Sequence, residues 1–79
     1  MFYVYAIKSL TRNYVYVGLT NNIERRISEH NSGRNKTKRA YKPFKLIYSK
    51  EFENRIDARE REKYLKTDYG KEFLKGLSN

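Results

Sequence analysis

The pattern of apolar and polar side chains near the N-terminus predicts two β-strands. Residues Phe2–Lys8 and Tyr14–Leu19 are rich in aromatic and β-branched side chains, which favour extended backbone. The serine, threonine and asparagine residues between these segments are typical of a turn. The two segments therefore predict a β-hairpin.

A short amphipathic helix is expected after the hairpin, from Ile23 to the closing residues 31–33. Ile27 and His30 recur with Ile23 at helical spacing, and the threonine and asparagine side chains just before them are good N-terminal caps. Arg26 belongs to the same stripe, so an arginine and a histidine border the apolar face. Both side chains should therefore lie near the sheet.

The next segment combines a basic run with a third strand. Residues 34–42 carry basic side chains without an apolar period and are expected to form an exposed loop. Within Phe44–Phe52, Phe44, Leu46 and Tyr48, with Phe52 as a further candidate, alternate with polar or edge residues, which predicts a strand.

Two helices are predicted downstream of this strand. The side chains of Asn54 and Asp57 can satisfy free N–H groups at a helix start, so a helix should run from Arg55 to Thr67. Residues 68–70 should interrupt it before a short last helix over Lys71–Leu77. The order ββαβα with a short C-terminal helix indicates an α+β fold. Its small, mostly antiparallel sheet of three strands should be flanked by helices on one face or both.

Composition narrows the class of protein. The 79 residues include 18 Lys+Arg and 9 Asp+Glu, a net charge of +9. This charge favours nucleic acid as a partner and, more weakly, anionic membrane, although a merely soluble basic protein has the same balance. The absence of cysteine and the single histidine exclude a disulfide framework and a multi-ligand zinc site. Without a signal peptide or an apolar span of about 20 residues, one cytoplasmic domain over residues 1–79 is expected.

Tyrosine, arginine and histidine side chains can converge beside the first predicted helix. Tyr14 and Tyr16 lie on one face of the second strand, which leads into the helix that carries Arg26 and His30. A purely structural alternative is that Arg26 extends to water and His30 is a cation at the negative end of the helix dipole.

The second predicted helix carries one acid that faces the domain. Leu65 marks its buried side, Glu62 falls about 40 to 60° from that side, and Glu60 points nearly opposite. A carboxylate beside the core needs a basic partner or a metal. An ordinary ion pair of Glu62 with Lys66 or Arg26 is the simpler alternative.

Together, these residue types are suited to phosphodiester hydrolysis. Tyrosine has an ordinary pKa of about 10, but a neighbouring cation favours its phenolate, which can take a proton from the attacking water. Arginine donates to phosphate oxygens as negative charge develops. A single carboxylate can hold Mg²⁺ or Mn²⁺ while waters and substrate oxygens complete the shell.

Four motifs in chain order resemble those of the GIY-YIG nuclease domain family. Tyr3-Val4-Tyr5 stands at the position of Gly-Ile-Tyr, and Tyr16-Val17-Gly18 at that of Tyr-Ile-Gly. Residues 18–31 are similar to the family's G-x-T-x(5)-R-x(3)-H-N stretch, and residues 58–66 to the helix with its metal-binding glutamate. The resemblance covers almost the whole chain. It is strongest to the short, single-domain members described as excinuclease C subunit-like.

The resemblance implies a role for each matching residue. The residues that match the family's site are Tyr5, Tyr16, Gly18, Arg26, His30 and Glu62. One tyrosine would be the general base, with Tyr16 preferred, and the other would orient water or phosphate. The arginine would stabilise the transition state, the histidine would hydrogen-bond the tyrosines, and the glutamate would bind the single metal ion. The glycine would let backbone or substrate approach closely, since any side chain there would intrude.

The resulting hypothesis is a divalent-metal-dependent DNA endonuclease, structure-selective or weakly sequence-selective, of the repair or recombination type. Its substrate would be branched, nicked or duplex DNA, and a homodimer or a protein partner is left open. The residues expected to hold phosphates without reading sequence are Arg34, Lys36, Lys38, Arg39 and Lys66.

Two other functions remain open at this point. The first is a catalytically idle nucleic-acid-binding module of the same fold. The second is an RNA-binding protein, which would present Tyr41 and Tyr48 outward beside the basic loop for stacking.

Overall fold

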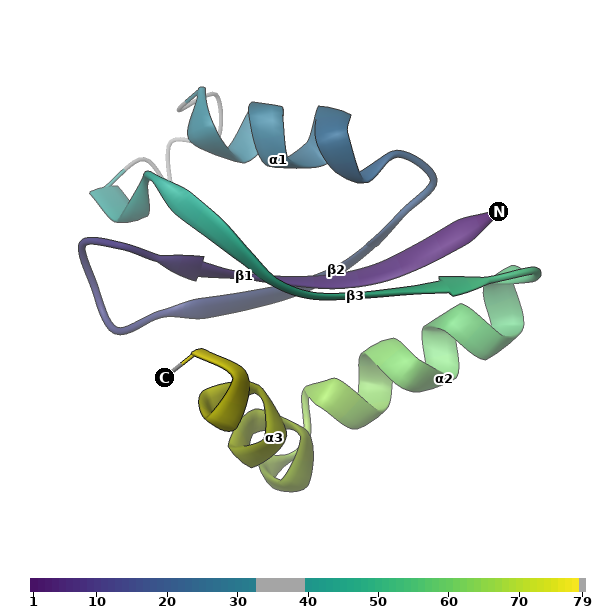
Figure 1. The fold of residues 1–79 in the computed structure, drawn as a ribbon. Helices are drawn as coiled ribbons and strands as arrows, with labels where there is room; N and C mark the ends of the chain where they lie inside the picture. Colours follow the sequence, from purple (N-terminus) through teal and green to yellow (C-terminus); the bar gives the residue numbers. More distant parts are fainter. Residues whose placement is uncertain (33–39, 79) are drawn as a thin grey trace.

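A computed structural model, which describes residues 1–32 and 40–78, shows a three-stranded antiparallel sheet. β1 (Phe2–Ser9) is the central strand, and β2 (Val15–Thr20) and β3 (Phe44–Phe52) lie at its two edges (Figure 1). β1 and β2 form the predicted hairpin. The predicted α+β fold is confirmed.

Helices cover both faces of the sheet. α1 (Ile23–Asn31) lies on one face, and α2 (Arg55–Leu65) and α3 (Asp68–Ser78) lie on the other (Figure 1). The sequence had left open whether one face or both would be covered. None of the helices in the described part of the chain is long and apolar enough to cross a membrane.

The central strand is buried on both of its faces. Residues 4–7 of β1 have no exposed surface. Because side chains alternate along a strand, they divide between two clusters. The buried cluster on the α2 and α3 face consists of Val4, Ala6, Val17, Ala58, Leu65 and Leu74. The buried cluster on the α1 face consists of Tyr5, Ile7 and Phe44.

Asparagine side chains start α1 and α2, as the sequence predicts. Asn22 Oδ1 accepts a hydrogen bond from the Arg25 N–H at 3.1 Å, and Asn54 Oδ1 accepts from the Asp57 N–H at 2.8 Å. Each bond satisfies an N–H group that has no partner within its helix.

The last helix begins at Asp68, earlier than the predicted start at Lys71. Thr67 Oγ1 accepts the N–H of Gly70 at 3.2 Å, in the manner of an N-terminal cap. The chain therefore turns after Leu65, where α2 ends. The prediction that residues 68–70 interrupt the helical structure is wrong, because they form the first turn of α3.

β3 spans the predicted residues, but its side chains do not keep one alternation. Its pairing with β1 is shifted between Ala6 and Ile7, which face Tyr48 and Leu46. Phe44 packs on the α1 face, Tyr48 packs on the α2 and α3 face, and Leu46 is 41% exposed. A common face for Phe44, Leu46 and Tyr48 was therefore a wrong prediction, because an irregularity in the pairing reverses the alternation.

Most of the predicted basic loop lies outside the described residues, including Arg34, Lys36, Lys38 and Arg39. Tyr41 stacks on Tyr14 with 4.6 Å between ring centroids, and Tyr48 lies edge-on to Phe73 at 5.7 Å. These two tyrosines belong to clusters on opposite faces of the sheet. The outward pair that the RNA-binding alternative requires is not found.

α3 packs closely against the end of α2 at Gly70. A Cβ atom at this position would lie 2.3 Å from the carbonyl oxygen of Tyr64 and 2.4 Å from Cα of Leu65. These are backbone atoms, which cannot turn aside as the end of a side chain can. On the same helix, a Cβ atom at Gly76 would meet no heavy atom within 4 Å.

The two glycines of α3 should respond oppositely to alanine. Gly70→Ala should lower the free energy of unfolding by about 1–3 kcal/mol, because the added methyl group overpacks the helix contact. Gly76→Ala should raise it by about 0.5–1 kcal/mol, since alanine favours the helix and the space is open. Urea denaturation followed by circular dichroism measures both changes. Equal effects of the two substitutions would contradict the close contact at Gly70.

Candidate functional site

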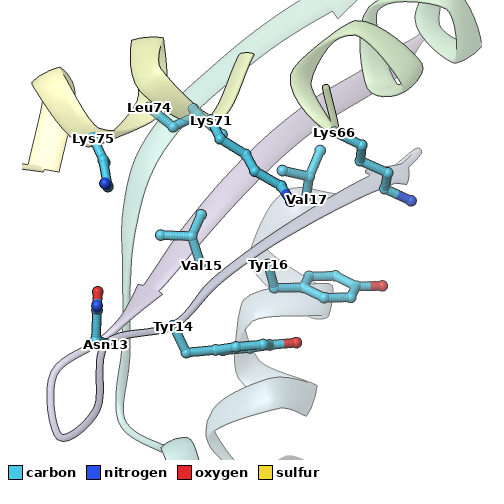
Figure 2. A pocket seen from close by; sticks show the side chains of 9 residues that line it. All are labelled: Asn13, Tyr14, Val15, Tyr16, Val17, Lys66, Lys71, Leu74 and Lys75. Carbon is cyan, nitrogen blue, oxygen red and sulfur yellow. The ribbon is translucent and has the colours of Figure 1, made fainter. Parts of the chain in front are cut away.

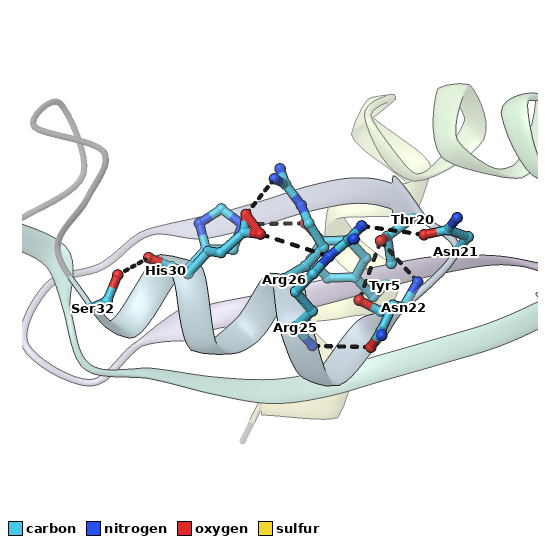
Figure 3. A network of polar contacts seen from close by, with 9 residues as sticks. Tyr5, Thr20, Asn21, Asn22, Arg25, Arg26, His30 and Ser32 are labelled. Atoms are coloured by element: carbon cyan, nitrogen blue, oxygen red, sulfur yellow. Dashed lines mark hydrogen bonds and ion pairs between the residues drawn. The ribbon is translucent and has the colours of Figure 1, made fainter.

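A buried hydrogen bond joins β1 to the last turn of α1. Tyr5 Oη lies 3.2 Å from Nε2 of His30, and His30 is 6% exposed (Figure 3). Tyr5 reaches α1 because its side chain points to the α1 face of the central strand. The histidine ring therefore lies against the sheet, as the helical spacing predicts. His30 is also in the last turn of α1, where the structural alternative places it.

Gly18 provides the space in which the two motif tyrosines meet. It pairs with Tyr5 across the β1–β2 ladder. A Cβ atom at Gly18 would lie 2.7 Å from Tyr5 Oη and 2.9 Å from Cε2 of Tyr16. The Tyr16 ring centroid lies 6.1 Å from that of Tyr5 and 4.9 Å from that of His30. The absence of a side chain at Gly18 therefore lets the phenols of both tyrosines approach the imidazole.

Arg26 supplies the positive charge beside this cluster. Burial raises the pKa of the Tyr5 phenol above its ordinary value, and the neighbouring Arg26 guanidinium opposes that rise. Arg26 also forms an ion pair with Glu29 of its own helix, with 3.0 Å between Nη1 and Oε2. Because a guanidinium only donates, the Tyr5 oxygen accepts from the Arg26 side. The tautomer of His30 then decides whether Tyr5 donates to Nε2 or accepts from it.

Asn31 fixes the end of α1 to β3. Its Oδ1 accepts the N–H of Phe44 at 2.7 Å, and its Nδ2 lies 3.5 Å from the Phe44 carbonyl oxygen. These bonds hold the helix beside the strand directly after His30, and thereby position the imidazole. In the sequence, Asn31 is visible only as the last residue of a motif. Its bonding to β3 has no sequence signal.

Three arginines line a shallow cleft of about 300 Å³ at the end of β2. Arg25 and Arg26 come from α1, and Arg55 comes from the first turn of α2. Thr20 and Asn21 lie in the same lining. Arginine side chains from both faces of the sheet thus meet at one end of the tyrosine cluster, where they can bind phosphate oxygens.

Glu62 is on α2, and therefore on the opposite face of the sheet from α1. Its side chain is 14% exposed, whereas Glu60 is fully on the exposed side, as predicted. The carboxylate lies 3.2 Å from Lys66 Nζ and 3.9 Å from Arg59 Nη1. The predicted alternative of an ion pair with Lys66 is thus present. The structure brings the tyrosines, Arg26 and His30 together on the α1 side, whereas Glu62 lies on the helix that covers the other face.

The donor set near Glu62 limits the kind of metal it could bind. Across residues 1–32 and 40–78, no group of three or more His, Cys, Asp or Glu side chains is arranged around a common metal position. One carboxylate fits a hard cation that keeps most of its waters, as Mg²⁺ does. Lys66 would have to release the Glu62 carboxylate for such an ion to bind.

Lysines on α3 face the same edge of the sheet, which the sequence had not indicated. Lys71 and Lys75 line a cleft with Lys66 and Tyr16 (Figure 2). Their spacing of four residues would place them on one side of the helix. Their meeting with β2 depends on where the chain turns after α2, which the sequence predicts at residues 68–70 and the structure has directly after Leu65.

Comparisons with known proteins identify the family of this chain. The family described as "GIY-YIG catalytic domain" matches residues 1–76. A UPF0213 protein of Clostridium perfringens is 45% identical over 67 residues, which cover 84% of this chain and 71% of that protein. A UPF0213 protein of Pediococcus acidilactici is 38% identical over 81 residues, which cover 99% of this chain and 82% of that protein.

A solved structure is similar in fold as well as in sequence. The solution NMR structure of a UPF0213 protein from Bacillus halodurans has a TM-score of 0.57 and 32% identity. The match covers 98% of this chain and 85% of that chain. Three findings lead to one conclusion. The motif tyrosines meet over a motif glycine, the family matches nearly the whole length of the chain, and the fold is shared with a solved structure. The chain belongs to the GIY-YIG catalytic domain family and is similar to its small UPF0213 members.

Proposed function

We propose that this chain is a divalent-metal-dependent endonuclease that hydrolyses phosphodiester bonds in DNA, with residues 1–79 acting as one nuclease domain. The observation that carries the proposal is the buried pair of Tyr5 and His30, with Tyr16 and Arg26 directed at the same place. A hydrogen bond with only a structural task would need neither the second phenol nor the guanidinium. Membership of a nuclease family agrees with this reading.

Tyr16 is the proposed general base. Tyr5 has no exposed surface and a raised pKa, so it stays protonated and donates to His30. Tyr16 is partly exposed, and its hydroxyl points out along the edge of the sheet (Figure 2). Only Tyr16 can contact a water molecule aligned with a bound phosphate. Tyr5 then orients His30, whose ring lies against Tyr16.

Arg26 is proposed to stabilise negative charge on the phosphate. Its guanidinium has five N–H donors, of which the Glu29 ion pair engages one side. Arg25 and Arg55 line the same cleft and would hold neighbouring phosphates of the strand. Contacts of this kind position the backbone without reading sequence.

Glu62 is the proposed ligand of a single Mg²⁺ or Mn²⁺ ion. When bound, such an ion would polarise a phosphate oxygen and neutralise developing charge. Lys66 neutralises the carboxylate in the structure, and on binding of the ion its ammonium group would move to a DNA phosphate. The same residue thus exchanges one anionic partner for another.

A second candidate function is a nucleic-acid-binding module without activity. The observation that favours it is the pairing of Glu62 with both Lys66 and Arg59. A carboxylate held by two cations has less tendency to take up a third.

Glutamine substitutions on α2 distinguish the two functions. Glu62→Gln should slow metal-dependent cleavage by about 100-fold or more, since a metal ion supplies several kcal/mol of transition-state stabilisation. Glu60→Gln, a matched change on the exposed side of the same helix, should leave cleavage unchanged. Labelled duplex, flapped and single-stranded DNA with Mg²⁺, Mn²⁺ or chelator provide the assay. Cleavage by Glu62→Gln at the wild-type rate would reject the metal site, and binding without any cleavage in all three proteins would favour the module.

The two tyrosines should differ when their hydroxyl groups are removed. Tyr16→Phe removes the proposed base and should slow cleavage by about 100-fold or more. Tyr5→Phe should slow it less, because Tyr5 acts through His30. Single-turnover cleavage rates measure both effects. If Tyr5→Phe is the slower enzyme, the base is Tyr5.

Tyr5 also makes the free energy of unfolding depend on pH, and the direction of this dependence follows from the shift of its pKa. Because its pKa is raised in the folded protein, its contribution to stability is complete below the ordinary tyrosine pKa of about 10. That contribution is lost as the pH rises through the folded value. Wild type should therefore lose free energy of unfolding above about pH 10 relative to Tyr5→Phe, which does not ionise there. Urea denaturation across this range makes the comparison, and parallel curves would contradict the burial of the Tyr5 phenol.

A further inference from the structure

A cleft of about 400 Å³ runs along the free edge of β2 (Figure 2). β2 pairs only with β1 within the described sheet, so its outer edge faces this cleft. The opposite wall is formed by the end of α2 and by α3. The residues that line it are Asn13, Tyr14, Val15, Tyr16, Val17, Lys66, Lys71, Leu74 and Lys75.

The floor of the cleft is apolar and its rim is basic. Val15, Val17 and Leu74 come from β2 and α3, and Leu74 is 2% exposed. Lys66, directly after α2, and Lys71 and Lys75 of α3 lie along the helix side of this floor, as Figure 2 shows. No acidic side chain is among the lining residues, and outside the lining Lys66 pairs with Glu62 at 3.2 Å and Lys75 with Glu72 at 3.9 Å. A ligand of this cleft should therefore combine a flat or apolar part with negative charge.

The cleft continues directly from the proposed active site. Tyr16 belongs to both, since its ring lies against His30 while it also lines the cleft. Lys66, which holds the Glu62 carboxylate, is on the same rim. Tyr14 follows Tyr16 along the strand, and the two side chains extend in the same direction (Figure 2). A strand whose phosphate reaches Tyr16 thus has the cleft immediately beside it.

We propose that this cleft binds an unpaired nucleotide next to the scissile phosphate, so that the enzyme prefers DNA with a single-stranded flank. The inference rests on the proposed nuclease function and specifies its substrate class. A base would lie on the apolar floor beside the rings of Tyr14 and Tyr16, while the lysines would neutralise the phosphates on either side. Single strands are bound in this way, by aromatic stacking within a basic groove.

The volume of the cleft, about 400 Å³, matches one nucleotide. Ligand pockets of about 300–1,000 Å³ hold small molecules, and a nucleotide is of this size. A duplex presents only its phosphates to such a surface, because its bases are stacked inside the helix. It could contact the lysine rim but could not reach Val15, Val17 or Leu74.

Binding of labelled oligothymidine, measured by fluorescence anisotropy with chelator present, tests the inference without requiring cleavage. The double variant Lys71→Glu/Lys75→Glu should bind this strand about 10-fold or more weakly than wild type, since two phosphate contacts are reversed in sign. Lys45→Glu/Lys50→Glu is the matched control. It makes the same charge change on exposed residues of β3, at the other edge of the sheet.

A second binding experiment uses the wild-type protein and therefore does not depend on whether a variant folds. An abasic strand of the same length keeps every phosphate but removes the bases. It should bind about 5-fold or more weakly than oligothymidine, because base stacking is lost. Paired duplex of the same length should also bind more weakly than the single strand.

The outcomes separate this inference from the proposed function. Equal weakening by both double variants, or equal binding of abasic and normal strands, would overturn the cleft as a nucleotide site. A protein that binds in the expected pattern but cleaves nothing would keep the cleft and reject the nuclease. A protein that cleaves flapped and fully paired DNA equally, without any effect of Lys71→Glu/Lys75→Glu, would keep the nuclease and reject the cleft.

Discussion

The central strand β1 packs against helices on both of its faces, and this double burial determines where the site can form. Val4 and Ala6 lie in the cluster beneath α2 and α3, while Tyr5 and Ile7 face α1. Because strand side chains alternate, a shift of one residue would exchange the two sets. The apolar packing of one face therefore fixes the direction of the Tyr5 ring on the other.

That direction places the Tyr5 hydroxyl inside an apolar layer, and the surrounding residues supply its hydrogen-bond partners. The Tyr5 hydroxyl lies over Gly18 and is bonded to His30, whose helix is fixed to β3 by Asn31. Among the residues that the structure describes, no buried side-chain polar atom lacks a hydrogen-bond partner. A fully satisfied polar group is rigid. Rigidity at this point presents Tyr16 and Arg26 to a substrate in a defined arrangement.

Local signals in the sequence predicted most of the fold, because caps and alternation act over a few residues. Asn22 and Asn54 begin helices where expected, and Arg26 and His30 face the sheet as their spacing indicates. Features that depend on contacts between distant segments were not predictable. The irregular pairing that turns Tyr48 to the other face and the packing of the α3 lysines beside β2 are of this kind. The position of Glu62 across the sheet from α1 belongs with them.

The tautomer of the only histidine in the chain tests the central claim most directly. If Tyr5 donates to Nε2 of His30, the neutral imidazole must carry its proton on Nδ1. Long-range ¹H–¹⁵N NMR at neutral pH distinguishes the two ring nitrogens, and the single histidine makes the assignment unambiguous. The Nδ1–H form in wild type, with a shift toward the Nε2–H form in Tyr5→Phe, is the predicted result. An Nε2–H imidazole in wild type, or identical spectra for the two proteins, would contradict the account.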